Sequence, residues 1–455
     1  MRNRLLTSAL AGALTLGLAS PSAAAGAGGG WQTVVGAQRV SEDTLFSPRG
    51  CQPHTEVEPD IAMDPNHPDV VVAVFQVGRC EGGAADVGYA TSNDGGRTWA
   101  AGFMPLLTRV GGGPFERGDD PAVAFGPDGS VYVVEMGFNQ GNCGSVVAVQ
   151  RSDDHGLTFG RPVYAEKDCG PFNDKTWIAV DDFPGSPFFG RIYVAWLRLA
   201  AGEDIVLRHS DDRGSTWSPR VQVSPKNSGP EGAFPVVQPN GDLTVLYRRD
   251  YPFGPLVAQT SHDGGESFGA PVKVAEVHPK EPKDLRTGLG VPSASVDPTS
   301  GYLYVVWQDH RFSSDGTNDA VLSRSTDGGA TWDPVVRVSP PDGERILDQF
   351  TPAVAAFGGF VHVSYFSRER SPGLFDRVYL NETTGTEPSL AFGPQLTLGP
   401  PGDLRFAALS GRQRFLGDYL GLAASADAVH AVWCLPTPAR PGPQHQAAYS
   451  GTVLR

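Results

Sequence analysis

The sequence predicts an all-β fold, a single ring of four-stranded antiparallel sheets, from three observations. A ten-residue turn motif occurs five times, and the stretches between its copies repeat the same order of short β-prone runs. Gly and Pro are abundant, with 57 and 39 of the 455 residues, whereas charged residues make up only 19%. A hydrophobic content of 40% is enough for a packed core, so the composition favours a turn-rich globular protein.

The turn motif first occurs as TSNDGGRTWA, starting at Thr91, and returns as RSDDHGLTFG, HSDDRGSTWS, TSHDGGESFG and RSTDGGATWD. Asp before Gly favours a tight turn, because Gly adopts positive φ angles and the Asp side chain bonds to turn amides. The aromatic residues that close the copies lie 51 to 64 residues apart and are Trp99, Phe159, Trp217, Phe268 and Trp332. This spacing indicates one turn for each four-stranded unit.

The strands of each unit follow one order. An apolar run such as PDIAM or DPAVAF precedes a strongly β-prone run such as VVVAVF or VYVVEM, and two more runs flank the turn motif. Two further units, starting at FTPAVAAF and YLGLAAS, lack a good motif, and the last has only three runs. The N-terminal segment WQTVVGAQRVS resembles a fourth-strand run, so we expect it to complete the last sheet and close the ring without exposed edges. The prediction is therefore seven blades, with six as the alternative.

The pattern S-x-D-x-G-x-T-W/F between a third and a fourth strand resembles the Asp-box (BNR) repeat, which sialidases share with several other β-propeller families. The resemblance implies a single Asp-box β-propeller domain over residues 31–455. It also implies that the Asp boxes stabilise the fold on the face opposite the active site. The aspartates in these structural positions are Asp94, Asp154, Asp212, Asp263 and Asp327.

The N-terminus has the pattern of a secretory signal peptide, with MRNR before an apolar run of about 15 residues and the small-residue stretch SPSAAA. We expect a signal peptide over residues 1–25, a Gly-rich spacer over 26–30, and a secreted, monomeric protein without a transmembrane segment. The net charge of −14 argues against nucleic acid as a partner. Cysteine pairing stays open: Cys51/Cys80 and Cys143/Cys169 are the nearest candidate pairs, and Cys434 is left over.

Charged residues recur where the strands of a propeller approach its axis. Acidic residues stand at the starts of first strands, among them Glu58 and Asp119, and arginines follow second strands. An inner carboxylate ring could perform acid–base chemistry or hold Ca²⁺, although no cofactor is required, and an outer arginine ring suits an acidic ligand. The alternative is that acids and arginines pair with one another and fix the loops. The catalytic candidates are Glu231, Asp120, Asp174, Asp418 and Tyr419, and the substrate-binding candidates are Arg248, Arg249, Arg311, Arg79 and Arg368.

Compared with sialidases, the match to the catalytic residues is partial. EGAFPVVQPNGDLTVLYRR resembles the family's glutamate and second arginine, which implies these roles for Glu231 and for Arg248 or Arg249, and Arg311 stands where the third arginine is expected. Val57 or Glu58 replaces the first arginine, Phe350 replaces the tyrosine nucleophile, and Asp86 is only a loose candidate for the acid/base. If the protein is an enzyme, we expect an exo-sialidase-like glycoside hydrolase or another polysaccharide-acting enzyme.

The predicted function is therefore recognition, extending to hydrolysis, of an extracellular, acidic glycan or polysaccharide. The alternative is a non-catalytic scaffold that binds a glycan or a protein.

Overall fold

The computed structural model describes residues 30–31, 33–42, 48, 50–141, 145–200, 202, 204–340, 347–369, 376–438 and 444–455. The expected signal peptide (1–25) and residues 26–29 of the expected spacer lie outside the described residues, as does Cys143. A disulfide joins Cys51 to Cys80, and Cys434 is a buried free thiol.

Within the described residues the chain is nearly all β, and its main sheets are seven antiparallel blades. Blades 1 and 2 consist of β2 (Glu56–Met63), β3 (Val71–Arg79), β4 (Ala84–Ser92) and β5 (Ala100–Phe103), then β6 (Arg117–Phe125), β7 (Val131–Phe138), β8 (Ser145–Ser152) and β9 (Val163–Asp168). Blades 3 and 4 consist of β10 (Phe172–Val180), β11 (Ile192–Leu199), β12 (Asp204–Ser210) and β13 (Val221–Gln222), then β14 (Glu231–Val237), β15 (Leu243–Arg248), β16 (Leu256–Ser261) and β17 (Val272–Ala275). Blades 5 and 6 consist of β19 (Ser293–Val296), β20 (Leu303–Asp309), β21 (Asp319–Ser325) and β22 (Val336–Arg337), then β23 (Leu347–Phe357), β24 (Phe360–Glu369), β25 (Arg377–Thr386), β26 (Ala391–Phe392) and β27 (Leu396–Thr397), with β28 (Gly402–Asp403) also pairing with β25.

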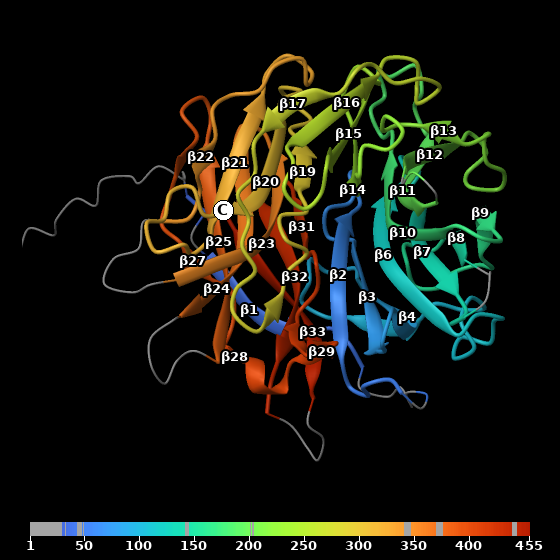
Figure 1. The fold of residues 1–455 in the computed structure, drawn as a ribbon, viewed down its shortest axis with the longest axis horizontal. Helices are drawn as coiled ribbons and strands as arrows, with labels where there is room; N and C mark the ends of the chain where they lie inside the picture. Colours follow the sequence, from blue (N-terminus) through green and yellow to red (C-terminus); the bar gives the residue numbers. More distant parts are fainter. Residues whose placement is uncertain are drawn as a thin grey trace, which may run out of the picture.

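Blade 7 closes the ring. It combines β31 (Gly421–Ala424), β32 (Ala428–Pro436) and β33 (Gln446–Leu454) with β1 (Thr33–Arg39), which pairs antiparallel with β33 so that Thr33 lies opposite Leu454. In Figure 1 the blue strand β2 of blade 1 lies beside the red strand β32 of blade 7. The innermost strands of all seven described blades line one axial cavity of about 610 Å³. The propeller fold, the seven blades and the closing role of the N-terminal strand are therefore confirmed.

A small additional sheet lies outside the blades. It joins β18 (Leu285–Arg286), β29 (Ala408–Ser410) and β30 (Gln413–Phe415), and a 3-10 helix, η1 (Leu404–Phe406), precedes β29. β18 pairs in parallel with β30, which ties the segment before blade 5 to the segment before blade 7. This sheet carries Arg286 and Phe415 to the axial site described below.

Apolar side chains from the faces of neighbouring blades form the core. Trp196, Trp307 and Trp433 occupy the second strands of blades 3, 5 and 7 and are fully buried. Between blades 3 and 4, for example, Tyr193 packs in one cluster with Val245. Because each blade covers the apolar face of the next, one blade alone would leave such residues in water.

The Asp boxes are closed hydrogen-bonded turns. In the fifth box, Asp327 accepts the hydroxyl of Ser325 (2.9 Å) and the amide of Thr331 (2.8 Å) on Oδ1, and the hydroxyl of Thr331 (2.5 Å) on Oδ2. The amide of Gly329 donates to the Ser325 hydroxyl at 2.8 Å. The other four boxes repeat this pattern around Asp94, Asp154, Asp212 and Asp263. Each carboxylate is thus engaged within its own turn.

We expect Asp327→Ala to lower the free energy of unfolding by about 1–3 kcal/mol, because the turn loses an acceptor for two hydroxyls and one amide. Urea denaturation at pH 7 measures this change. Glu276→Ala, which removes an exposed carboxylate paired with the exposed Lys273, serves as the control and should change stability little. Equal stability of Asp327→Ala and the wild type would contradict a stabilising role for the Asp box.

Candidate functional site

The site begins with an irregularity that recurs at the starts of the innermost strands. The register shifts after Val57 in β2, after Asp119 in β6 and after Asp174 in β10, and similar shifts occur in β14 and β23. The residues at these bulges have positive φ and are Glu58 (53°), Asp120 (44°), Lys175 (50°), Gly232 (77°) and Thr351 (49°). A bulge re-aims the side chain that it carries, and positive φ is costly for residues other than Gly. Three blades thus use a strained residue to bring a charge to one site.

Lys175 lies at the centre of this site, with its side chain only 11% exposed. Its Nζ donates to Oδ2 of Asp418 at 2.7 Å and lies 3.7 Å from Glu58 and 3.8 Å from Asp120. Its backbone amide donates to Asp120 (2.6 Å) and to Asp174 (3.0 Å). Lys175 therefore connects carboxylates from blades 1, 2 and 3 with the segment that enters blade 7.

Arg286 adds a second cation from the small sheet. It donates to Asp418 at 2.5 Å and to the hydroxyl of Ser410 at 2.9 Å, and its side chain is 33% exposed. Two guanidinium groups lie over the ring of Phe415. That of Arg286 is 4.5 Å from the ring centroid and that of Arg79 is 4.9 Å from it. The parallel pairing of β18 with β30 holds Arg286 beside Phe415.

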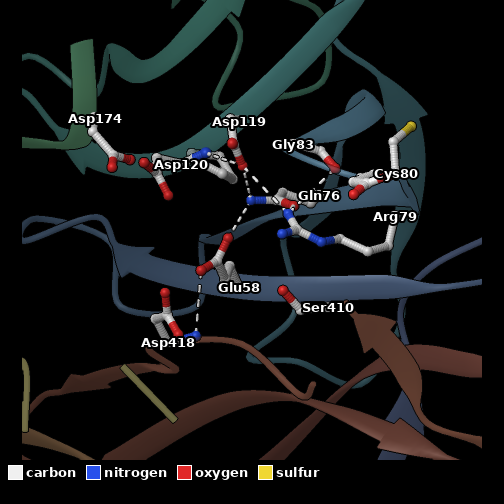
Figure 2. A network of polar contacts seen from close by, with 12 residues as sticks. Glu58, Gln76, Arg79, Cys80, Gly83, Asp119, Asp120, Asp174, Ser410 and Asp418 are labelled. Atoms are coloured by element: carbon white, nitrogen blue, oxygen red, sulfur yellow. Dashed lines mark hydrogen bonds and ion pairs between the residues drawn. The ribbon is translucent and has the colours of Figure 1, made fainter. Parts of the chain in front are cut away.

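Figure 2 shows how Gln76 links the acids of blades 1 and 2. Its amide nitrogen donates to both Glu58 and Asp119, and its oxygen accepts from Arg79 at 3.0 Å. Arg79 is buried, also donates to the carbonyl of Gly83 and lies 3.8 Å from Asp119. The backbone amide of Asp418 donates to Glu58 at 3.3 Å.

The environment sets the carboxyl groups to different pKa values. Burial raises the pKa of Glu58, Asp120 and Glu231 to about 7 in each case, although the charge of Lys175 acts in the opposite direction. Burial also acts to raise the pKa of Asp418, but the charges of Lys175 and Arg286 outweigh it and hold that pKa well below its usual range. Near pH 7 the site therefore combines an ionised carboxylate with carboxyl groups that can still donate a proton.

Two acidic residues of the site are less buried than the others. Asp174 and Glu231 start the innermost strands of blades 3 and 4 and are half-buried, whereas Glu58, Asp120 and Asp418 are buried. Burial raises the pKa of Asp174, and the negative charge of Glu231 adds to this effect, so the two groups are close enough to interact. A substrate could touch Asp174 and Glu231, while the deeper charges hold them in position.

Tyr419 directly follows Asp418 in the sequence and is buried. Its hydroxyl donates to the carbonyl of Pro121 at 3.3 Å, and its ring contacts Trp177 edge-on. Burial and the surrounding acids raise the pKa of Tyr419 well above its usual value. This favours a neutral, structural phenol over a nucleophile. Where sialidases have the tyrosine, Phe350 is buried and stacks on Phe366.

The predicted outer ring of arginines does not converge. Arg248 is fully buried, and its guanidinium donates to the carbonyls of Pro252 (2.8 Å), Gly254 (2.9 Å) and Leu289 (3.2 Å). The other predicted arginines have separate partners: Arg311 pairs with Asp309, Arg249 with Asp250, and Arg368 donates to the carbonyl of Lys283. Of the five predicted substrate-binding arginines, Arg79 lies within the axial group, and Arg248 lies opposite Glu231 in the β14–β15 pair.

Three carboxylates could in principle hold a cation, because oxygens of Glu58, Asp119 and Asp120 lie within 4.8 Å of one another. These groups already have cationic or N–H partners, however, since Gln76 donates to Glu58 and Asp119 and Lys175 lies against Glu58 and Asp120. A protonated lysine inside the group opposes a divalent cation by charge repulsion. The charge of Lys175 therefore disfavours, at these three carboxylates, the Ca²⁺ that the sequence left open as a possibility.

Sequence reasoning missed Lys175, Gln76 and Arg286. Lys175 had the clearest signal, because it directly follows Asp174 at the start of a first strand. Gln76 lies within an apolar second strand, where it looks like an ordinary solvated or edge residue. Arg286 belongs to a segment before blade 5 that fits no unit of the repeat, so no repeat position identified it.

None of the described helices is long and apolar enough to span a membrane. The BNR repeat-like domain family matches residues 69–340, more than half of the chain. No curated protein matches the chain closely enough to count as a relative. Among solved structures, the GH93 α-L-arabinofuranosidase of Fusarium graminearum, in complex with arabinobiose, is 12% identical with a TM-score of 0.50, covering 92% of this chain and 98% of its own. The Hadza microbial sialidase Hz136 is 19% identical with a TM-score of 0.50, covering 74% of this chain and 67% of its own.

We expect the protein to lose stability as the pH rises from 5 to 8. Glu58, Asp120 and Glu231 keep their protons up to about pH 7 in the folded protein, but the unfolded chain releases them near pH 4 to 4.5. In this window the folded state binds more protons, so each such group lowers the free energy of unfolding by up to about 1.4 kcal/mol per pH unit. The low pKa of Asp418 acts in the opposite sense, but only below about pH 4.

Urea denaturation at pH 5, 6, 7 and 8 measures this slope. Glu58→Gln should flatten it, and Glu276→Gln, which changes an exposed carboxylate, should leave it unchanged. A free energy of unfolding that is constant or rises over this range would show that the buried acids are ionised throughout.

Proposed function

The chain belongs to the BNR repeat-like domain family, and from this premise we propose that it is a secreted β-propeller that binds and hydrolyses an extracellular glycan at its axial acidic site. The observation that carries the proposal is the meeting of half-buried Asp174 and Glu231 beside Lys175, with the pKa of Glu231 raised to about 7. Glycoside hydrolysis requires a protonated carboxyl group beside an ionised one, and we assign these roles to Glu231 and Asp174. At 12% and 19% identity the solved relatives support the fold only, so the chemistry is argued from the site.

Glu231 has the properties of a general acid. The residue is half-buried, and burial keeps its carboxyl protonated up to about pH 7, so it can donate a proton to the oxygen of the leaving sugar. Asp174, on the neighbouring blade, is the second carboxylate, which either attacks the anomeric carbon or deprotonates the attacking water. Lys175 donates its backbone amide to Asp174 and thereby fixes the position of this side chain.

The cations of the site are paired with its own carboxyl groups, which favours a neutral sugar. The acidic sugar expected from the sequence depended on converging arginines, but Arg248, Arg249, Arg311 and Arg368 have other partners. The axial group contains six carboxyl groups, namely Glu58, Asp119, Asp120, Asp174, Glu231 and Asp418, against three cations, namely Lys175, Arg79 and Arg286. Because Glu58, Asp120 and Glu231 keep their protons up to about pH 7, the charges of the group are close to balance below that pH. Each of the three cations already lies against a carboxyl group of the site, so we propose a neutral sugar, which needs no further cation.

We expect Glu231→Gln to reduce kcat on a responsive aryl glycoside by about 100-fold or more, because general acid catalysis typically contributes this much. The assay is fluorogenic release from a panel that includes α-L-arabinofuranosides, β-galactosides, β-xylosides and a sialoside. A substrate with a 2,4-dinitrophenyl leaving group needs little proton donation, so the variant should lose much less activity on it. The fall in wild-type activity above pH 7 should also disappear in Glu231→Gln.

Glu266→Gln provides the matched control, since it changes an exposed carboxylate in the fourth Asp box. Asp174→Asn should lose activity on both kinds of leaving group. Unchanged turnover in Glu231→Gln would overturn the assignment. Saturable binding of neutral oligosaccharides without turnover of any glycoside would replace hydrolysis by recognition alone, which is the alternative expected from the sequence.

A further inference from the structure

A second polar group lies between blades 1 and 2, away from the proposed catalytic pair. Asp86 in β4, Glu135 in β7 and Gln150 in β8 are all fully buried. Four of their oxygens have no hydrogen-bond partner among the described residues: Oδ2 of Asp86, both carboxyl oxygens of Glu135, and Oε1 of Gln150. Buried polar atoms without partners are rare in folded proteins and indicate a water, an ion or a functional constraint.

The register of β7 with β8 places Glu135 and Gln150 on one face, and segment 104–116 connects them with Asp86. Glu135 pairs with Ala148 and Val133 pairs with Gln150, so Glu135 and Gln150 lie on the same face of the β7–β8 pair. Segment 104–116 contacts both Asp86 and Gln150, because Thr108 bonds to Asp86 and the carbonyl of Pro105 accepts from Gln150. The negative charge of Asp86 also acts directly on Glu135.

The segment 104–116 covers this interface and is shaped around Asp86. The hydroxyl of Thr108 donates to Oδ1 of Asp86 at 2.8 Å. A Cβ on Gly111 would stand 3.5 Å from the other carboxyl oxygen and only 2.4 Å from the carbonyl of Met104, so the segment passes too close for a side chain. The amide nitrogen of Gln150 donates to the carbonyls of Pro105 and Gly160, which leaves its oxygen as the free atom.

The four unpartnered atoms of the group are all oxygens, so the group offers acceptors and ligand atoms but no donor to pair with them. Burial and the charge of Asp86 raise the pKa of Glu135 well above its usual value, and no basic side chain among the described residues offsets them. Two carboxylates and an amide oxygen, with a hydroxyl close by, are the ligands that hard cations prefer. This distinguishes the group from the axial acids, where Lys175 supplies the positive charge.

We propose that Asp86, Glu135 and Gln150 bind a hard divalent cation of the calcium class between blades 1 and 2. The site is independent of the proposed hydrolysis. Its consequence for the fold is local: segment 104–116 leads directly into β6, which carries Asp119 and Asp120, so a bound cation would brace the start of that strand.

The test compares thermal unfolding at pH 8 in EGTA and in 1 mM CaCl₂, with bound metal counted by elemental analysis. We expect one Ca²⁺ per chain and a rise in Tm of about 5 °C or more, because the ion binds only the folded protein. Glu135→Gln and Asp86→Asn should abolish both effects. Glu58→Gln, which changes the axial group instead, should keep both.

A reversal of stability separates a cation site from a mere acidic pair. In EGTA, Glu135→Gln should unfold at the same temperature as the wild type or higher, because it removes a carboxyl group that repels Asp86 when ionised, and its amide can donate to Asp86. In Ca²⁺ the wild type should become the more stable protein. Absence of bound metal and of any Ca²⁺-dependent shift in the wild type would overturn the proposal in favour of carboxyl groups that share protons. A shift that persists in both variants would overturn it by placing the ion elsewhere.

Discussion

The axial end of the propeller depends on the ion pairs that the ammonium group of Lys175 makes with the surrounding carboxylates. Closing a ring of blades brings the starts of the innermost strands together, and in this chain those starts are acidic. Without a central cation, Glu58, Asp120 and Asp418 would face one another in a poorly solvated space, where like charges repel strongly. Removing one partner from such a buried group is far more costly than breaking a surface pair.

Strained backbone at three strand bulges brings the charged side chains to the axis. A strand that kept its regular register would alternate its side chains between the two faces of the blade. The bulges at Glu58, Asp120 and Lys175 interrupt this alternation and turn three charged side chains inwards at positive φ. The backbone cost is offset by the ion pairs that these residues make, so the charges and the irregular strands stabilise each other.

Repetition made most of the fold predictable. The strands, the Asp-box turns and the pairing of β1 with β33 follow from patterns in adjacent residues, and so do the carboxylates at the starts of inner strands. The sequence could not show that the guanidinium group of Arg248 is already hydrogen-bonded. Its partners are carbonyls of residues 252, 254 and 289, whose positions depend on the path of two loops. Lys175 was missed for a similar reason: a lysine beside an aspartate is ordinarily solvated, and only the bulge turns it inwards. Sequence patterns thus predict backbone architecture better than they predict which polar groups remain available.

The pairing of β1 with β33 makes ring closure an encounter between segments from opposite ends of the described chain. Contacts so distant in sequence form slowly, and until they form, the edge of β33 is open to any strand of matching pattern. The best match is β1 of a second molecule at high concentration. Two chains that exchange this strand would each have a complete seventh blade and would form a domain-swapped dimer without any new interface chemistry.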